Sequence, residues 1–227
     1  MTTVFSETEL ARASSYHREE DRRRFVTACW MLRTVAAAQL GVNPRAVRID
    51  RRCTECGRPH GKPRLLADGT ALEVSVSHSG NRVAVALSTG GPVGIDVEEL
   101  APDPAGVPQL ALSPAELKRL QALPPQDQEL GFITMWVRKE AVLKATGHGL
   151  RIPPDQVEVS GPREDPALFG WPLDIAPAAV DLRTLDPGDG YAAVVALLAD
   201  GHPVKVSEIQ FTPLSQRDSD AAAINAA

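Results

Sequence analysis

The segment GPVGIDVEEL, residues 91–100, places carboxylates at alternate positions of an otherwise apolar stretch. Apolar residues alternate there with Gly94, Asp96 and Glu98, which is the pattern of a β-strand with one apolar face. Side chains on one face of a strand lie roughly 6.5–7 Å apart, so the two carboxylates can reach one cation between them. Gly94 shares that face, and we expect it to leave room for a ligand. The alternative is a strand end that runs into solvent, where acidic residues are common.

Two further segments of alternating apolar residues precede this strand. LEVSVSHS (72–79) and RVAVALS (82–88) are separated by a Gly-Asn turn, and Thr-Gly-Gly then leads to the strand with Asp96. The pattern predicts an antiparallel meander, in which the first and third strands run in the same direction and end at one edge of the sheet. Ser77 and His78 are therefore expected on the same side as the carboxylates.

The segment MWVRKEAVLKATGHGL, residues 135–150, has the periodicity of a helix. Trp136, Glu140 and Lys144 fall at i, i+4 and i+8 and share one stripe of its surface. A charge pair beside apolar residues indicates a face that turns toward a cleft, since a fully solvated face is normally polar all round. An exposed ion pair between Glu140 and Lys144 is the alternative.

The remaining pattern predicts an α+β protein of two halves, each with helices and an antiparallel sheet. Predicted helices are 6–40 in two pieces, 114–123 and 126–146; further predicted strands lie near 46–52, 156–160, 179–185, 191–199 and 203–209. The proline-rich stretch 101–114 is the predicted linker between an N-terminal half, 1–100, and a C-terminal half, 101–211. The polar tail, 212–227, is predicted to be disordered.

Composition favours a soluble globular protein, because 43% of the residues are hydrophobic and 23% charged, with no apolar run near the length of a membrane span. The first residues lack a basic stretch followed by an apolar core, so we expect a cytoplasmic location. The net charge of -5 is unevenly divided, since residues 1–64 carry 13 Lys and Arg against 7 Asp and Glu. A basic part beside an acidic body suits an anionic ligand and a metal, although ordinary surface charge explains it equally.

Three cysteines, Cys29, Cys53 and Cys56, are too few for a disulfide framework. In CTECGRPH (53–60), the last two form a C-x-x-C pattern that is followed by His60, and such a set can bind zinc. A structural zinc site is tetrahedral and takes four ligands, but no fourth is evident. The sequence alone therefore favours reduced loop thiols.

Three motifs at their spacing, VSHSG (76–80), VGIDVEE (93–99) and WVRKEAVLKATGHGL (136–150), resemble those of the 4'-phosphopantetheinyl transferases of the surfactin-synthetase-activating (Sfp) type. The resemblance runs from YHREEDRRRF to YAAVVAL and so covers most of the chain. It implies a pseudo-twofold, two-lobed α+β fold with the site between the lobes. It also implies transfer of the phosphopantetheine arm of coenzyme A to a serine of an apo acyl or peptidyl carrier protein, releasing adenosine 3',5'-bisphosphate.

The resemblance also assigns roles to residues of this chain. Asp96, Glu98 and Glu140 are expected to hold Mg²⁺, for which Mn²⁺ can substitute, on the coenzyme A pyrophosphate. Glu140 is the candidate base for the carrier serine, and Lys144 is expected to neutralise the departing bisphosphate. Asp96, Glu140 and Lys144 are thus the expected catalytic residues.

Coenzyme A is expected to contact residues from both halves. Arg24 and His78 are assigned to its 3'-phosphate, and Lys62 and Pro63 to its adenine end. The full expected set is Arg24, Lys62, Pro63, Ser77, His78, Asp96 and Lys144. Glu116 matches a further acidic position of the family, but it also follows Ser113 by three residues, which is the spacing of a helix capping box; the sequence leaves both roles open.

Two other functions fit the acidic residues, namely a metal-dependent phosphohydrolase and a coenzyme A-binding protein without catalysis. The resemblance favours the transferase, acting as a monomer and without nucleic acid or membrane partners. It allows carriers of secondary metabolism and of fatty acid biosynthesis alike.

Overall fold

The computed structural model describes residues 4–53, 55–66, 72–100, 110–174, 179–199 and 204–211. It contains helices α1 (Glu7–Ser14), α2 (Glu19–Leu40), α4 (Pro114–Gln121) and α5 (Pro125–Ala145), with short 3-10 turns at Pro44–Ala46, Gly149–Arg151 and Pro154–Gln156. The strands are β1 (Ile49–Asp50), β2 (Arg64–Leu65), β3 (Glu73–Ser79), β4 (Arg82–Ser88), β5 (Val93–Glu99), β6 (Glu158–Val159), β7 (Leu168–Gly170), β8 (Val180–Leu185) and β9 (Tyr191–Leu198). The expected α+β class is confirmed.

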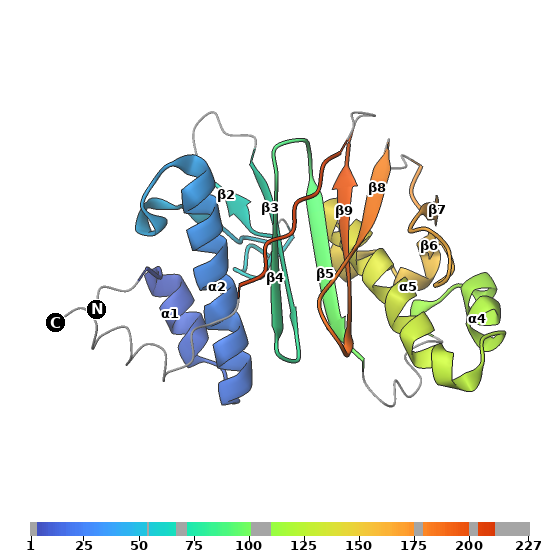
Figure 1. Cartoon of the computed structure of the whole chain (residues 1–227). Coiled ribbons are helices and arrows are strands. Elements are labelled where there is room, and N and C mark those ends of the chain that lie inside the picture. Colours follow the sequence, from blue (N-terminus) through green and yellow to red (C-terminus); the bar gives the residue numbers. More distant parts are fainter. Residues whose placement is uncertain are drawn as a thin grey trace.

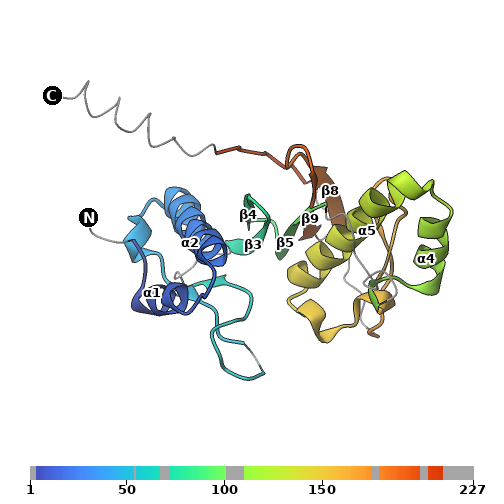
Figure 2. The same ribbon diagram turned by 90° about the horizontal axis from the view of Figure 1, so that it is seen from below.

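Two lobes lie side by side, each with helices packed against strands (Figures 1 and 2). In the first lobe, α2 lies along the β3–β4 hairpin, and α1 is held on α2 by a buried ion pair between Glu9 and Arg33 at 2.9 Å. The predicted apolar stripe of α2 is buried as expected, with members Phe25, Cys29, Leu32 and Ala36. In the second lobe, α5 packs against β5 and β9, and its apolar side chains form the largest buried cluster among the described residues.

The predicted meander is wrong in its last step. β3 and β4 pair antiparallel as expected, but β5 pairs antiparallel with β9, and β9 pairs with β8. All five residues Val93–Val97 of β5 are buried, so this strand has no solvated face. The apolar strand β9, which is distant in sequence, buries β5 more fully than the half-exposed β4 could. The strand that carries Asp96 therefore joins the sheet of the second lobe.

Between β3 and β5, serine hydroxyls accept hydrogen bonds that backbone carbonyls would accept in a regular sheet. Ser75 Oγ accepts a hydrogen bond from Ile95 N, and Ser79 Oγ accepts one from Glu99 N, both at 3.1 Å. Alternate N–H groups of a strand point to opposite edges, so these two face away from β9 and toward β3. Ser75 bonds Ile95 and Ser79 bonds Glu99, so the residue numbers increase together along the two strands. β3 and β5 therefore run in the same direction, as predicted.

Gly94 brings the main chain of α5 against β5. A Cβ atom at this position would collide with the carbonyl oxygen of Ala141 and the amide nitrogen of Ala145. The expectation that Gly94 leaves room for a ligand is therefore wrong, because the helix itself fills that space. The close approach has a different consequence: it sets α5 directly over the strand face that carries Asp96 and Glu98.

Replacing Gly94 by alanine should destabilise the protein by roughly 1–3 kcal/mol, as overpacking does, and toward the upper end because both obstructing atoms belong to the main chain. Urea unfolding monitored by circular dichroism measures the effect. Gly90→Ala is the matched control, since its nearest neighbours would lie 4.0 Å from the new Cβ. Equal stability of the two variants would show that α5 can move away from β5 without cost.

The C-terminal strands are only partly as predicted. β6, β8 and β9 lie at three of the four predicted places, β7 was not expected, and residues 204–211 form no strand. Tail residues 212–227 and linker residues 101–109 lie outside the described part, and the division into halves 1–100 and 101–211 stays a prediction. No helix within the described ranges is long and apolar enough to cross a membrane.

Candidate active site

The acidic face of β5 meets the predicted stripe of α5. Lys144 Nζ donates to Asp96 Oδ1 at 2.6 Å. Trp136 is close enough to Glu98 to lower the pKa of that carboxyl group, against the larger rise that burial causes. Glu140 lies between Trp136 and Lys144 on the helix, one turn from each. The stripe is not a solvated face, since Glu140 is only 9% exposed; that it faces a cleft stays a prediction. The alternative of an exposed Glu140–Lys144 pair is excluded.

Asp96 is the centre of a buried hydrogen-bond network. Its Oδ1 atom accepts from Ser77 Oγ at 2.7 Å as well as from Lys144 Nζ, and Lys144 Nζ lies 3.0 Å from Ser77 Oγ. The three residues come from β3, β5 and α5, so the network joins both lobes. The expectation that Ser77 lies on the same side as Asp96 is thus confirmed, although the adjacency of β3 and β5 brings them together, not a shared meander edge.

Glu140 is a carboxyl group that retains its proton unusually well. Its pKa is raised from 4.5 to about 7, chiefly by burial; the Lys144 ammonium acts in the opposite direction, and the negative charges of Asp96 and Glu98 contribute to the rise. Burial also raises the pKa of Glu98. A carboxyl group that titrates near neutral pH can accept or give up a proton under physiological conditions, which is the property required of a general base or acid.

Glu140→Gln should make the Mg²⁺-free protein more stable at alkaline pH. A folded-state pKa above the unfolded value means that the folded state binds the proton more tightly, so stability falls as pH rises from 4.5 to about 7 and then levels off. Glutamine cannot ionise and avoids this loss, which amounts to at most about 3.4 kcal/mol at 1.36 kcal/mol per pKa unit. Urea unfolding at pH 5 and pH 8 measures it. Stability–pH curves that run parallel for the two proteins would show that Glu140 ionises freely.

The carboxylates of the site are suited to a hard cation. Asp96 Oδ2 and Glu140 Oε1 are buried, and neither has a hydrogen-bond partner among the described residues. Carboxylate oxygens are the ligands that Mg²⁺ prefers, and a divalent cation would relieve the repulsion between the three carboxylates. The oxygens of Asp96, Glu98 and Glu140 do not all lie within 4.8 Å of one another, and Lys144 holds one oxygen of Asp96. The residues fit Mg²⁺ in their chemistry.

A guanidinium and an imidazole lie at the C-terminal end of β3 and the N-terminal part of α2. The Arg24 guanidinium donates to the carbonyl of Gly80 at 2.9 Å and pairs with Asp21 at 2.7 Å. Partial desolvation of the His78 ring, together with the positive charges of Arg24 and Lys144, lowers the pKa of His78. His78 is exposed. Arg24 and His78 are therefore neighbours, as the resemblance implied, at a surface that can accept an anion.

Lys62 links the first lobe to the C-terminal end of α5. Its Nζ atom donates to the carbonyl of Ala145 at 3.2 Å and lies 3.7 Å from Glu73. Burial lowers the pKa of Lys62. Pro63, which follows it, is buried. Lys62 thus lies at the same end of α5 as Lys144, between the lobes.

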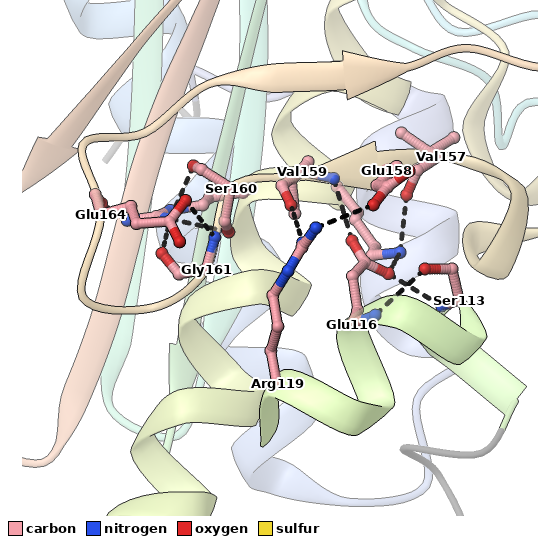
Figure 3. A network of polar contacts seen from close by, with 11 residues as sticks. Ser113, Glu116, Arg119, Val157, Glu158, Val159, Ser160, Gly161 and Glu164 are labelled. Carbon is pink, nitrogen blue, oxygen red and sulfur yellow. Dashed lines mark hydrogen bonds and ion pairs between the residues drawn. The ribbon is translucent and has the colours of Figure 1, made fainter. Parts of the chain in front are cut away.

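Glu116 is a buried structural residue, and the structure places it away from the carboxylates of β5. It is 0% exposed, and its Oε2 atom accepts from Ser113 N at 2.8 Å and from Lys139 Nζ at 2.5 Å. Its Oε1 atom accepts from Val159 N at 2.9 Å, so that Glu116 connects α4 to the β6 segment (Figure 3). The capping box is confirmed, and both carboxylate oxygens are used in holding the second lobe together.

Sequence reasoning missed the role of the serines of β3. Ser75, Ser77 and Ser79 alternate along one face of the strand, and their hydroxyls bond the N–H of Ile95, the carboxylate of Asp96 and the N–H of Glu99, respectively. The signal was present in VSVSHS, because three hydroxyls on one strand face need polar partners when that face is covered.

Two protein-family descriptions match the chain. Residues 1–90 match "4'-phosphopantetheinyl transferase, N-terminal", and residues 92–196 match "4'-phosphopantetheinyl transferase superfamily". The 4'-phosphopantetheinyl transferase HetI of Nostoc sp. is 34% identical over 206 residues, which cover 88% of this chain and 81% of that protein. A putative 4'-phosphopantetheinyl transferase of Synechocystis sp. is 33% identical over 150 residues, which cover 65% of this chain and 58% of that protein.

Two further similarities have lower sequence identity. The 4'-phosphopantetheinyl transferase Sfp of Bacillus subtilis is 24% identical over 199 residues, which cover 88% of this chain and 84% of that protein. A crystal structure of a holo-(acyl-carrier-protein) synthase from Bacillus anthracis matches with a TM-score of 0.41 and 21% identity, covering 48% of this chain and 96% of that one.

Proposed function

The chain belongs to the 4'-phosphopantetheinyl transferase superfamily and is a transferase, and on that premise we propose that it moves the phosphopantetheine arm of coenzyme A to a serine of an apo acyl or peptidyl carrier protein. Adenosine 3',5'-bisphosphate is the product that leaves. The observation that carries this proposal is the meeting of three residues from two lobes, Ser77, Asp96 and Lys144, beside Glu140 with its raised pKa.

Glu140 is the residue that we propose as base for the carrier serine. Its carboxyl group titrates near neutral pH, so it can take the hydroxyl proton directly or through water. Lys144 is accessible to the leaving group, because its side chain is 26% exposed while Asp96 positions its ammonium. Mg²⁺ bound to Asp96, Glu98 and Glu140 would offset the negative charge that builds on the leaving phosphate.

Residues of the first lobe are proposed to bind coenzyme A. Arg24 and His78 form the site for the 3'-phosphate, for which the planar guanidinium suits a two-point contact. Ser77 is assigned to the phosphates beside Asp96, and Lys62 with Pro63 to the adenine end. The assigned residues follow one another across the molecule, from α2 past the end of β3 to the C-terminal end of α5.

We further propose that the enzyme is of the Sfp type, a cytoplasmic monomer whose two lobes form the pseudo-twofold pair. The chain supports this because each lobe supplies side chains to the same buried network, so that one chain completes the site. Mn²⁺ is expected to replace Mg²⁺, because both accept carboxylate oxygens. The carrier domain is expected to be one of secondary metabolism or fatty acid biosynthesis.

Mass spectrometry of a carrier protein tests the proposal. The protein is incubated with an apo carrier, coenzyme A and Mg²⁺, and the carrier should become heavier by one phosphopantetheine arm. Hydrolysis of coenzyme A with an unchanged carrier would indicate a phosphohydrolase. Binding of coenzyme A without either change would indicate a binding protein. Omission of the metal is the matching control, and the carrier should then keep its apo mass.

Arg24→Ala should weaken the use of coenzyme A but hardly alter the use of dephospho-coenzyme A. A charged hydrogen bond is worth about 1.5–3 kcal/mol, so losing it should lower kcat/KM for coenzyme A roughly 10- to 150-fold. The measurement compares both substrates at one salt concentration, because exposed charges are screened. Arg22→Ala is the control, since Arg22 lies on the same helix but pairs with Glu19 on the surface. An equal loss on both substrates would place Arg24 in the fold instead of the 3'-phosphate site.

A further inference from the structure

A loop of the first lobe brings two thiols and an imidazole together. The donor atoms of Cys53, Cys56 and His60 all lie within 4.8 Å of one another, and the Cys56 Sγ atom lies 2.9 Å from His60 Nε2. Within the described ranges, no other set of three or more His, Cys, Asp or Glu side chains converges as closely. Cys56 and His60 are exposed, so a metal ion can reach them from solvent.

We propose that Cys53, Cys56 and His60 form a Zn²⁺ site. Zinc binds cysteine sulfur at about 2.3 Å and imidazole nitrogen at about 2.0–2.1 Å in a tetrahedron, which places such donor atoms roughly 3.5–3.8 Å apart. The three side chains therefore need only small rotations to reach this geometry. Two thiolates and an imidazole are donors that favour zinc over Mg²⁺, so this site and the carboxylate site select different metals.

The lack of a fourth protein ligand, which weighed against zinc in the sequence, does not exclude it. Zinc sites with three protein ligands keep a fourth position for water or another molecule. Two thiolates also balance the double charge of the ion.

The main chain of the loop is folded to present these side chains. Cys53 N donates to Arg58 O at 2.8 Å, Gly57 N donates to Cys53 O at 2.9 Å, and Gly61 N donates to Arg51 O at 2.7 Å. Gly57 has a φ of +68°, a conformation that a residue with a side chain rarely adopts. It reverses the chain directly after Cys56, so that His60 returns to the two thiols.

Both lobes hold the loop in place. Arg12 of α1 donates to the Pro59 carbonyl at 2.6 Å, and Glu55 pairs with Arg151 of the second lobe at 3.2 Å. The loop leads within two residues to Lys62, whose ammonium contacts the end of α5. A zinc ion here would therefore fix a segment that connects the lobes beside the proposed coenzyme A site.

The acidity of Cys56 does not distinguish zinc binding from thiol oxidation. A hydrogen bond from the Arg58 side chain is the largest cause that lowers the pKa of Cys56 to about 6, and His60 contributes. A thiolate is needed for either chemistry. The convergence of an imidazole with both sulfurs favours the metal, because a dithiol that forms a disulfide has no need of the third group.

Metal analysis of the protein tests the site directly. The full chain is produced without a histidine tag and incubated with one equivalent of zinc; excess metal is then removed by gel filtration. We expect one zinc per chain in the wild type and in Cys29→Ala, whose cysteine is buried in the α2 stripe. We expect none in Cys53→Ser/Cys56→Ser. His60→Gln should bind zinc at least about 100-fold more weakly in competition with a chromophoric chelator, since even changes to groups behind the ligands cost 10- to 100-fold.

Two further readouts separate this site from adventitious binding. Co²⁺ in place of zinc should give the visible absorption bands of tetrahedral thiolate coordination in the wild type but not in the double variant. Zinc at a hundred times its dissociation constant should raise Tm by roughly 5–10 °C. A zinc-free wild type, zinc retained by the double variant, or a wild type lighter by two hydrogen atoms through a Cys53–Cys56 disulfide would each overturn the proposal.

A consequence for catalysis rests on the proposed function. If Lys62 and Pro63 contact coenzyme A, removal of zinc should raise KM for coenzyme A more than it lowers kcat. Zinc stoichiometry and Tm do not depend on that assumption. A zinc-binding protein whose KM is unchanged by zinc removal would therefore contradict the placement of the adenine end and leave the metal site standing.

Discussion

The Glu140→Gln variant should load a carrier protein at least about 10³-fold more slowly than the wild type, although it is folded and, without Mg²⁺ and above neutral pH, more stable. Removing a general base costs about 10²–10⁴-fold, and a Mg²⁺ ion that is held less firmly would offset less of the negative charge on the leaving phosphate. Glu140 is proposed for both roles. Because glutamine has the size of glutamate and relieves a buried charge, the loss of activity cannot be attributed to unfolding.

Asp96→Asn should show a loss of similar size, since Asp96 orders both Ser77 and Lys144 through one oxygen. The matched control is Glu129→Gln, which changes a carboxylate of the same helix on the same face, three turns from Glu140. Single-turnover transfer to an apo carrier at saturating Mg²⁺ measures all three variants. Near wild-type transfer by Glu140→Gln would remove Glu140 from the catalytic residues.

The second large effect is on stability and concerns the buried pair Glu116–Lys139. Both side chains are 0% exposed. Lys139 Nζ donates to Glu116 Oε2 at 2.5 Å, to the Val157 carbonyl at 2.6 Å and to the Pro154 carbonyl at 2.8 Å, so all three of its protons are used. Lys139→Met should cost about 3–5 kcal/mol, because it leaves a buried carboxylate without its counter-charge.

Equilibrium unfolding in urea measures this cost. Lys118→Met is the control, since Lys118 is exposed on α4 and its replacement should change stability by no more than about 0.5 kcal/mol. The double variant Glu116→Leu/Lys139→Met should recover part of the loss, because no uncompensated charge remains. Recovery should be incomplete, since Val159 N and the two carbonyls lose their partners. A cost near that of Lys118→Met would show that water reaches the pair.

Lys139 and Glu140 are adjacent in sequence but lie on different sides of α5. Successive helix residues point about 100° apart, so Lys139 enters the second lobe while Glu140 faces β5. The pair with Glu116 thereby fixes the rotation of α5 about its axis. Glu116 therefore has a structural role, whereas the sequence left both a capping and a catalytic role open for it.

The candidate site could be assembled from the sequence to a considerable extent because its parts are local. Alternation places Asp96 and Glu98 on one face of a strand, and a four-residue spacing places Glu140 and Lys144 on one face of a helix, whatever the rest of the fold does. The capping box of Ser113 and Glu116 is local in the same way, and it is confirmed.

These local rules could not predict which residues distant in the sequence contact one another. The meander failed because β5 pairs with β9, about a hundred residues later, and strand pairing depends on which apolar surface remains to be buried. The same limit explains the interpretation of Gly94. A glycine in a strand can leave space for a ligand or allow another main chain to approach closely. Only the position of α5 shows that the second explanation holds for Gly94.

The sequence by itself determined the periodicities, the caps and the residue types that can hold a cation or a phosphate, since these follow from backbone geometry within a few residues. Only the tertiary structure decided which of those groups meet. It brought Ser77 and Lys144 to the same oxygen of Asp96, buried Glu116 against Lys139, and drew Cys53, Cys56 and His60 within 4.8 Å. Such contacts depend on how whole elements pack to bury apolar surface. Residues from the entire chain contribute to the free energy of that packing, so no single position or short segment determines it.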